Sequence, residues 1–382
     1  MRITILFMCA ALTVITINAQ KKNPPPRAII NAVEQVDVLK TDGFKIDFPA
    51  KPARTVAPID TAYGKTNMVS YRLGTTYGFY GVNYIDFPTV ISDKTEISLR
   101  FDAVKAALIN SAEDRLISET EISFGGNPGM EYVIEGKDTT LTMRCLFIQQ
   151  RFFQLLIVTK GKLSKSTERV KNFNQKNIDK FINSFSVTEL PTPKLTAVEL
   201  PKDFGIEINS SIFTSRFFGF SIRMPENWSI VEKEQTDVLK DLSVQESENS
   251  SEKIQKSLDL SLKNTEVLLF MTKADAETSV NSAVIAIAAE RVSFPNFEPK
   301  AIADSFVKTF LEPDEKILRQ PSAVKIGGVD FSWVEVENTS KKFKQRFYIA
   351  NRKGIALQLL VIYENETELK TFLDLLTTVK FF

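Results

Sequence analysis

The sequence feature that most constrains the fold is a long internal repeat. Residues 326–363 follow the same pattern as residues 124–158: a Gly-Gly pair, a strand-like run ending at a glutamate, a polar turn, and two apolar runs typical of a hairpin. One spacing of 202 residues relates Gly126 to Gly328, Glu135 to Glu337 and Arg144 to Arg346. A constant spacing over about twenty positions indicates that one architecture is built twice.

The repeat extends beyond this core. Residues 43–49 and residues 219–225 each open with Gly-Phe, alternate apolar and polar side chains and end at proline, which predicts a strand in each copy. Gln154 and Gln358 stand 204 residues apart, so we assign two extra residues to the turn at 351–354 in the second copy.

These boundaries predict the domain organisation. We expect a signal peptide at residues 1–19, a Pro-rich tether and N-terminal segment at 20–41, a first α+β repeat at 42–187, a linker at 188–217, and a second α+β repeat at 218–382 with a helical insertion at 232–266. We expect α+β domains, each an antiparallel sheet with helices packed on it. The insertion would be a lid or docking element, or a helix that covers one sheet face.

The N-terminus predicts the compartment. Arg2 precedes an apolar run, and Asn18 and Ala19 suit cleavage by a signal peptidase. The alternative is an uncleaved anchor, because the run is close to the minimum length for a membrane span. We therefore expect a secreted or periplasmic protein without a transmembrane segment after cleavage.

Composition excludes several chemistries. The chain has no histidine, so Ser-His-Asp and Cys-His relays and histidine-ligated zinc are excluded. Its 48 Lys and Arg balance 47 Asp and Glu, which argues against a dedicated nucleic-acid binder. Cys145 is the only cysteine after residue 19, lies in an apolar run, and is expected to be a buried thiol.

The order of elements resembles the PsbP-like family of α-β-α sandwiches. The residues that carry this resemblance are 219–228, Gly327-Gly328 and the hairpin at 343–363, with a weaker echo in the first copy. Members of this family include extrinsic subunits of photosystem II and small bacterial extracytoplasmic proteins. The resemblance implies a tandem duplication of that domain and a non-enzymatic protein that works by binding another protein.

Few side chains suggest catalysis. Glu335 and Glu337 alternate along a strand and share a face, as a Ca²⁺ site, an acid-base pair or a solvent-facing strand would. Ser-x-x-Lys occurs at Ser305/Lys308 and Ser322/Lys325, a frequency expected by chance. Gly125-Gly126 and Gly327-Gly328 lack the spacing of a phosphate-binding loop, and Trp228 and Trp333 are expected in the core.

Two basic stretches remain, at residues 160–180 and 341–353. They would either contact an anionic partner, such as a membrane surface or an acidic glycan, or protect exposed strand edges from aggregation.

From these observations we predict an extracytoplasmic, non-catalytic binding protein with a protein or cell-envelope partner. We assign no catalytic, cofactor-binding or metal-binding residue and expect no cofactor. The alternatives are a hydrolase that uses carboxylates or a Ser-Lys pair, and a purely structural spacer.

Overall fold

The computed structural model describes residues 37–61, 64–76, 78–87, 89–109, 112–192, 198–232, 252–273, 283–309, 314–340 and 342–382. These residues divide between two compact units, residues 37–60 with 65–192 and residues 198–382. The predicted signal peptide and most of the predicted tether lie outside the described residues, and the exact domain boundaries stay predictions. No helix among the described residues combines the length and apolar character that a membrane span requires.

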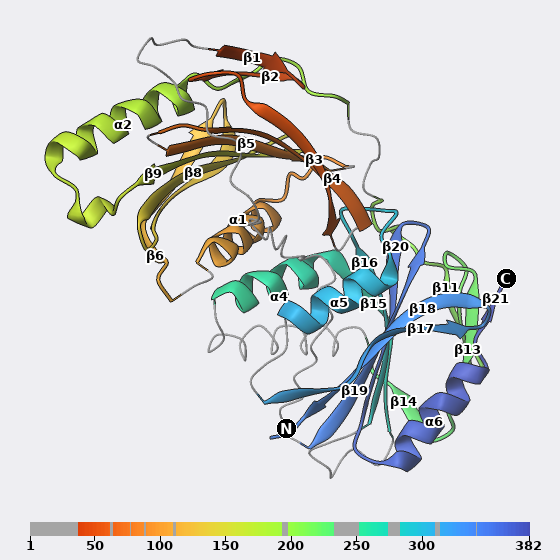
Figure 1. Ribbon diagram of the computed structural model, residues 1–382. Helices are drawn as coiled ribbons and strands as arrows, with labels where there is room; N and C mark the ends of the chain where they lie inside the picture. Colours follow the sequence, from red (N-terminus) through yellow and green to blue (C-terminus); the bar gives the residue numbers. More distant parts are fainter. Residues whose placement is uncertain are drawn as a thin grey trace. The chain divides into compact units, whose positions relative to one another are not determined.

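The first unit is built on a seven-stranded antiparallel sheet with the order β3-β4-β5-β9-β8-β7-β6. Its strands are β3 (Ala53–Thr61), β4 (Gly64–Gly74), β5 (Gly78–Asp86), β6 (Arg115–Phe124), β7 (Asn127–Glu135), β8 (Thr139–Ile148) and β9 (Arg151–Lys160). A small sheet of β1 (Asp37–Thr41), β2 (Phe44–Phe48) and β10 (Ser186–Val187) packs with α2 (Glu168–Asn183) on one face. The helix α1 (Lys94–Leu108) lies on the opposite face (Figure 1).

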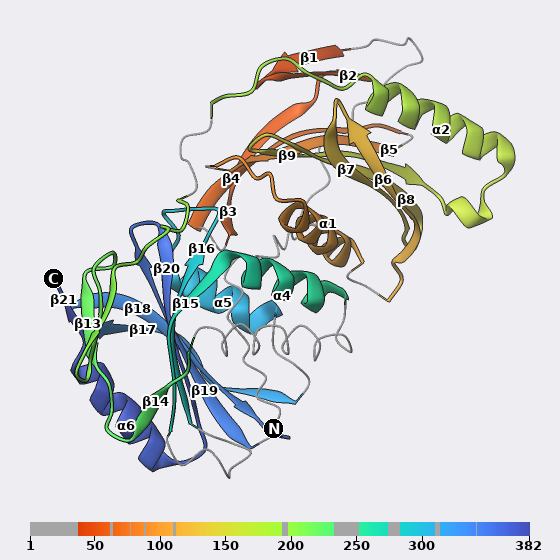
Figure 2. The ribbon, with the colours of Figure 1, turned by 180° about the vertical axis from the view of Figure 1, so that it is seen from behind.

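The second unit has the same plan. Its seven-stranded sheet contains β14 (Trp228–Ile230), β15 (Thr265–Lys273), β16 (Val284–Arg291), β20 (Ile355–Tyr363), β19 (Phe343–Arg352), β18 (Val329–Asn338) and β17 (Glu315–Ile326), in that spatial order. One face carries α4 (Glu252–Asn264) and α5 (Pro299–Thr309). The other carries α6 (Glu366–Thr377) and a small sheet of β11 (Ile206–Asn209), β12 (Ile212–Ser215), β13 (Phe220–Arg223) and β21 (Lys380–Phe381) (Figure 2).

The expected α+β class and α-β-α sandwich are wrong. About half of the described residues lie in strands and about a fifth in helices, and the strands form four antiparallel sheets. One face of each large sheet is covered largely by a second, smaller sheet. The fold is therefore β-rich.

The small sheets arise because the Gly-Phe strands do not join the large sheets. Gly43 and Gly219 adopt positive φ values of 84° and 66°, which turns the chain immediately before β2 and β13. The strand β2 then pairs with β1 and β10, and β13 pairs with β12 and β21. The predicted strands thus exist, but they cover the sheet instead of extending it.

The repeat is visible as the same strand order in both large sheets, but our alignment of its hairpin is wrong. Both the β8–β9 and the β19–β20 turns contain two residues, so the second copy has no longer turn there. The extra residues lie between β18 and β19, where Asn338 pairs with Phe343. Cross-strand pairing makes Trp333–Tyr348 the counterpart of Glu131–Arg144.

Two predicted segments contain regular structure. The range 188–217, expected as a linker, includes β11 and β12 of the second unit. The helix expected within the 232–266 insertion is α4, while residues 233–251 lie outside the described residues.

The core of the second unit makes a first testable prediction. Phe220 is fully buried and contacts the rings of Phe213, Phe218 and Phe381. Phe220→Ala should lower the free energy of unfolding by about 3–5 kcal/mol because it leaves a cavity. Ile212→Ala, on the neighbouring strand and 41% exposed, should change it by less than about 0.5 kcal/mol.

Urea unfolding followed by tryptophan emission measures this difference, since both tryptophans, Trp228 and Trp333, lie in the second unit. Equal losses in the two variants would show that β13 is not a core strand.

Candidate functional site

The candidate nucleophiles from the sequence do not form a catalytic arrangement. Cys145 is fully buried, and burial raises the pKa of its thiol, so the reactive thiolate is disfavoured. Ser322 and Lys325 lie on the strand β17, where a spacing of three puts side chains on opposite faces, and Lys325 pairs with Asp330. Ser305 and Lys308 lie on α5, but their side chains are outside the described set.

Glu335 and Glu337 share a sheet face but have different partners. Arg346 Nε donates to the Glu335 carboxylate at 2.7 Å, and the Tyr363 hydroxyl also donates to it. Glu337 lies across from Lys316 on one side and Lys344 on the other. The pair is therefore divided between two basic neighbourhoods and does not form a carboxylate dyad.

These residues belong to a surface on one face of β17, β18 and β19, which we call the Trp333 surface. Directly paired residues of neighbouring strands point to the same face. Three rows cross the strands: Lys316, Glu337 and Lys344; Arg319, Glu335 and Arg346; and Ser322, Trp333 and Tyr348.

The Trp333 ring is the centre of the Trp333 surface. It stacks on Tyr348 with ring centroids 5.6 Å apart and an interplanar angle of 8°. The guanidinium carbons of Arg319 and Arg346 lie 4.7 and 4.9 Å from its centroid. Trp333 is only partly buried, so our expectation of a core position holds for one side of the ring alone.

The electrostatics hold this arrangement in one charge state. Burial disfavours the charged form of Arg346, but hydrogen bonds with Glu335 and Tyr348 outweigh it and raise the pKa of the guanidinium. Burial, followed by the hydrogen bond to Glu335, raises the pKa of the Tyr363 hydroxyl. The arginine therefore stays protonated and the tyrosine neutral, which gives a fixed cationic and aromatic surface.

The first unit has a different pair at the matching position. There, Arg144 donates to the Glu131 carboxylate at 2.7 Å in place of the stacked rings. The aromatic pair is specific to the second unit, where Tyr348 is 3% exposed and contacts Phe372 of α6. The sequence did not identify Arg319 or Tyr348 as site residues. The alternation of Arg346 with Tyr348 on β19 indicates that Tyr348 shares a face with Arg346.

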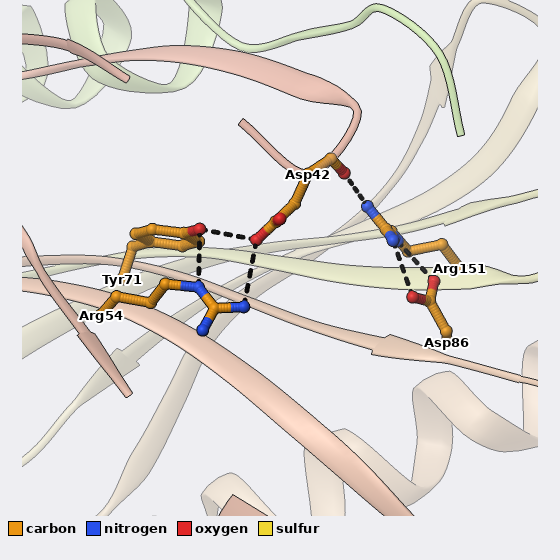
Figure 3. A network of polar contacts seen from close by, with 5 residues as sticks. All are labelled: Asp42, Arg54, Tyr71, Asp86 and Arg151. Carbon is orange, nitrogen blue, oxygen red and sulfur yellow. Dashed lines mark hydrogen bonds and ion pairs between the residues drawn. The ribbon is translucent and has the colours of Figure 1, made fainter. Parts of the chain in front are cut away.

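A second polar network lies in the first unit (Figure 3). The Tyr71 hydroxyl donates to the Asp42 carboxylate at 2.6 Å and accepts from Arg54 Nε at 3.0 Å. Arg151 donates to the Asp42 carbonyl and binds the Asp86 carboxylate with Nε at 2.5 Å and Nη2 at 2.7 Å. The network joins the β1–β2 turn to β3, β4, β5 and β9.

The charged groups of this network bind one another. Burial raises the pKa of Asp42, but hydrogen bonds from Tyr71 and Tyr84 and the charges of Arg54 and Arg151 outweigh it and lower the pKa. The Arg151 guanidinium lies 3.9 Å from the Tyr84 ring centroid, and its side chain is 3% exposed. We interpret the network as a latch that holds the small sheet, because its buried arginine already binds both a carbonyl and a carboxylate.

Neither basic stretch protects a strand edge, so that interpretation is wrong. Residues 160–180 run through α2, and β19 lies between β18 and β20 inside the sheet. In the second stretch Arg346 binds Glu335, Arg352 donates to the Phe218 carbonyl at 3.2 Å, and Lys353 donates to the Phe217 carbonyl at 2.5 Å. Lys162 and Lys165 of the first stretch line a hollow in the first unit.

Neither Gly-Gly pair is a ligand-binding loop. Both pairs have positive φ values and form the two-residue turns before β7 and β18, as a simple hairpin requires. Within the described part of the chain, no group of three or more Cys, Asp or Glu side chains is placed to hold a metal ion.

Comparisons with known proteins give only distant likenesses. No family model matches the sequence, and a search of curated proteins found no match. PsbP from Synechocystis sp. PCC 6803 aligns over 41% of this chain and 94% of its own, with 13% identity and a TM-score of 0.29. The T6SS immunity protein TplEi from Pseudomonas aeruginosa aligns over 91% of this chain and 97% of its own, with 10% identity and a TM-score of 0.24.

A chain of the Tle4–Tli4 complex aligns over 91% of this chain and 97% of its own, with 9% identity and a TM-score of 0.22. At these TM-scores the likenesses carry no conclusion, and the resemblance to the PsbP-like family has weak support.

The latch makes a prediction about acid stability. A carboxylate with a lowered pKa in the folded protein stabilises it above its ordinary pKa of 3.8, and this stabilisation is lost as the pH falls through the folded-state value. Asp42→Asn keeps a residue that tolerates the positive φ of 49° and removes the charge. The variant should be less stable than the wild type at neutral pH, and the difference should shrink below pH 3.8.

Urea unfolding followed by far-UV circular dichroism at a series of pH values measures this difference. A difference between the two proteins that does not change with pH would show that Asp42 does not form the proposed ionised latch.

Proposed function

We propose that this chain is a non-catalytic binding protein that acts outside the cytoplasm and holds a protein partner through the Trp333 surface. The observation that carries the proposal is the partly buried Trp333 ring, fixed by Tyr348, Arg319 and Arg346 on an ordered sheet. Tryptophan, tyrosine and arginine are the residues that dominate binding energy at protein interfaces. A site outside the cytoplasm stays a prediction from residues 1–19.

The charges of the Trp333 surface indicate the partner's chemistry. The rows around Trp333 contain two lysines and two arginines against Glu335 and Glu337. Glu335 is already bound by Arg346, while Lys316 and Arg319 are exposed. The surface therefore suits a partner segment that presents an acidic side chain next to an apolar or aromatic one.

Rigidity also supports binding through this surface. Arg346 and Glu335 have side chains 14% and 12% exposed, and the Tyr363 hydroxyl fixes the carboxylate from the neighbouring strand. A preorganised surface loses little side-chain entropy when a partner binds.

The edge strand β17 is not open for strand addition, because it is bulged at Ile317–Arg319 and again at Arg319–Ser322 and contains Pro321.

Trp333→Ala tests this proposal, because it removes the partly buried ring and leaves Tyr348, which is 3% exposed and contacts Phe372, in the core. Loss of the Trp333 ring should weaken partner binding by about 2 kcal/mol or more, about thirtyfold. The control is Glu131→Ala with Arg144→Ala, which should leave binding unchanged.

The measurement is quantitative capture from envelope extract by residues 20–382, followed by titration of the purified partner against wild type and both variants. Circular dichroism checks that the variants fold. A partner that binds Trp333→Ala and wild type equally would reject the Trp333 surface as the binding site.

A further inference from the structure

A hollow in the first unit gathers three lysines from two separate loops. It has a volume of about 410 Å³ and is lined by Lys137, Asp138, Gly161, Lys162, Lys165 and Ser166. Lys137 and Asp138 belong to the β7–β8 turn, while the others follow β9 and precede α2 (Figure 1). Three lysines against one aspartate leave a local charge of +2.

The loop that presents these lysines is held in place. The Thr140 hydroxyl donates to the Gly161 carbonyl at 3.0 Å and accepts from Leu163 N–H at 3.1 Å. Gly161 N–H donates to the Asp138 carbonyl at 2.8 Å, and the Ser166 hydroxyl donates to the Lys162 carbonyl at 2.8 Å. The two sides of the hollow are therefore tied together, and its lysines are presented by an ordered backbone.

A buried carboxylate fixes the same loop from below. Glu135 is 5% exposed and accepts from Ser164 N–H at 2.9 Å. Hydrogen bonds from Ser164, followed by the charges of Arg115 and Lys162, lower the pKa of Glu135 against the effect of burial. Ser164 N–H and Arg115 bind this carboxylate, and its charge also interacts with Lys162, so Glu135 offsets part of the positive charge of the hollow.

The lysine charges of the hollow are weakly compensated. Lys137 reaches Glu113 only at 3.9 Å, between side chains that are 73% and 60% exposed, a distance at which an ion pair contributes little. The helix α2 begins at Glu168, and its N-cap residue Thr167 makes no side-chain cap hydrogen bond. The positive end of the helix adds to the lysine charges, and the Glu168 carboxylate of its first turn is paired with Lys171 at 2.7 Å.

We infer that this hollow, which we call the Lys162 hollow, binds a phosphomonoester group. A phosphate dianion offers several acceptor oxygens that three mobile ammonium groups can approach together. The volume exceeds that of a phosphate alone and accommodates a small group attached to it, such as glycerol. This site is separate from the Trp333 surface, so the inference goes beyond the proposed partner binding.

The test uses one headgroup in two forms. Glycerol 3-phosphate, titrated by calorimetry, is the soluble form. Phosphatidylcholine vesicles containing phosphatidic acid, assayed by sedimentation, present the same phosphomonoester on a membrane. Vesicles containing phosphatidylserine carry a comparable surface charge without a phosphomonoester and control for general attraction.

Lys162→Glu combined with Lys165→Glu should weaken binding to the phosphomonoester probes by more than about tenfold, since each substitution replaces a charge-assisted hydrogen-bond donor with a like-charged carboxylate. Lys176→Glu reverses a charge on α2 in the same basic stretch but outside the hollow, and should weaken binding less than about twofold. Circular dichroism and thermal melting of each variant check the fold.

Each outcome decides the inference. Lysine-dependent binding of glycerol 3-phosphate, with or without vesicle binding, supports a site that takes a soluble phosphomonoester. Lysine-dependent binding of phosphatidic acid vesicles alone supports the same site with a lipid as the source.

Three outcomes overturn the inference: absence of binding to both phosphomonoester forms, equal binding to phosphatidylserine vesicles, or equal weakening by Lys176→Glu. Trp333→Ala should bind the probes as wild type does, which separates this result from the test of the proposed function.

Discussion

Each unit depends on the packing of one short strand against its large sheet. Phe44 of β2 contacts the rings of Tyr71, Tyr84, Phe153 and Phe185, which come from the sheet and from the chain just after α2. Phe220 of β13 is equally buried in the second unit. Without this layer, one apolar face of each sheet would meet water at a cost of about 25 cal/mol per Å².

The sequence predicted these strands but not the layer that they join. Glycine followed by apolar residues at every second position, Phe-Ile-Phe in the first copy and Phe-Ile-Met in the second, identifies a strand with one apolar face, and the positive φ of Gly43 and Gly219 explains the glycine. Which sheet a strand joins depends on contacts distant in sequence, such as the pairing of Phe220 with Phe381. Alternation is the same for a strand of the main sheet and for one in a covering layer, so the pattern could not separate the two fold classes.

The hairpin alignment failed for a related reason. Both copies contain a Glu-Arg cross-strand pair, Glu131 with Arg144 and Glu335 with Arg346, and the constant spacing of 202 residues made the two arginines seem equivalent. The extra residues lie before β19 and shift the strand by one full pleat, so Tyr348 takes the position of Arg144. A shift of two residues preserves which side chains face the core, so apolar alternation alone could not detect it. Trp333 was predicted as core because aromatic residues next to strands usually are, and the shifted alignment hid its partner Tyr348.

The two units of this duplicated fold share some contacts and differ in others. In each, an arginine from the long hairpin donates to the carbonyl that precedes the turn glycine, Arg151 to Asp42 and Arg352 to Phe218. Arg151 lies on β9 and Arg352 on β19. Both units therefore keep an arginine bond to this carbonyl but form it from a different strand of the hairpin. The sheet position around Trp333 differs between the units: Glu131 and Arg144 form an ion pair in the first, and Trp333 stacks on Tyr348 in the second. Positions at which two copies of one fold carry different chemistry are those at which selection for a partner can act.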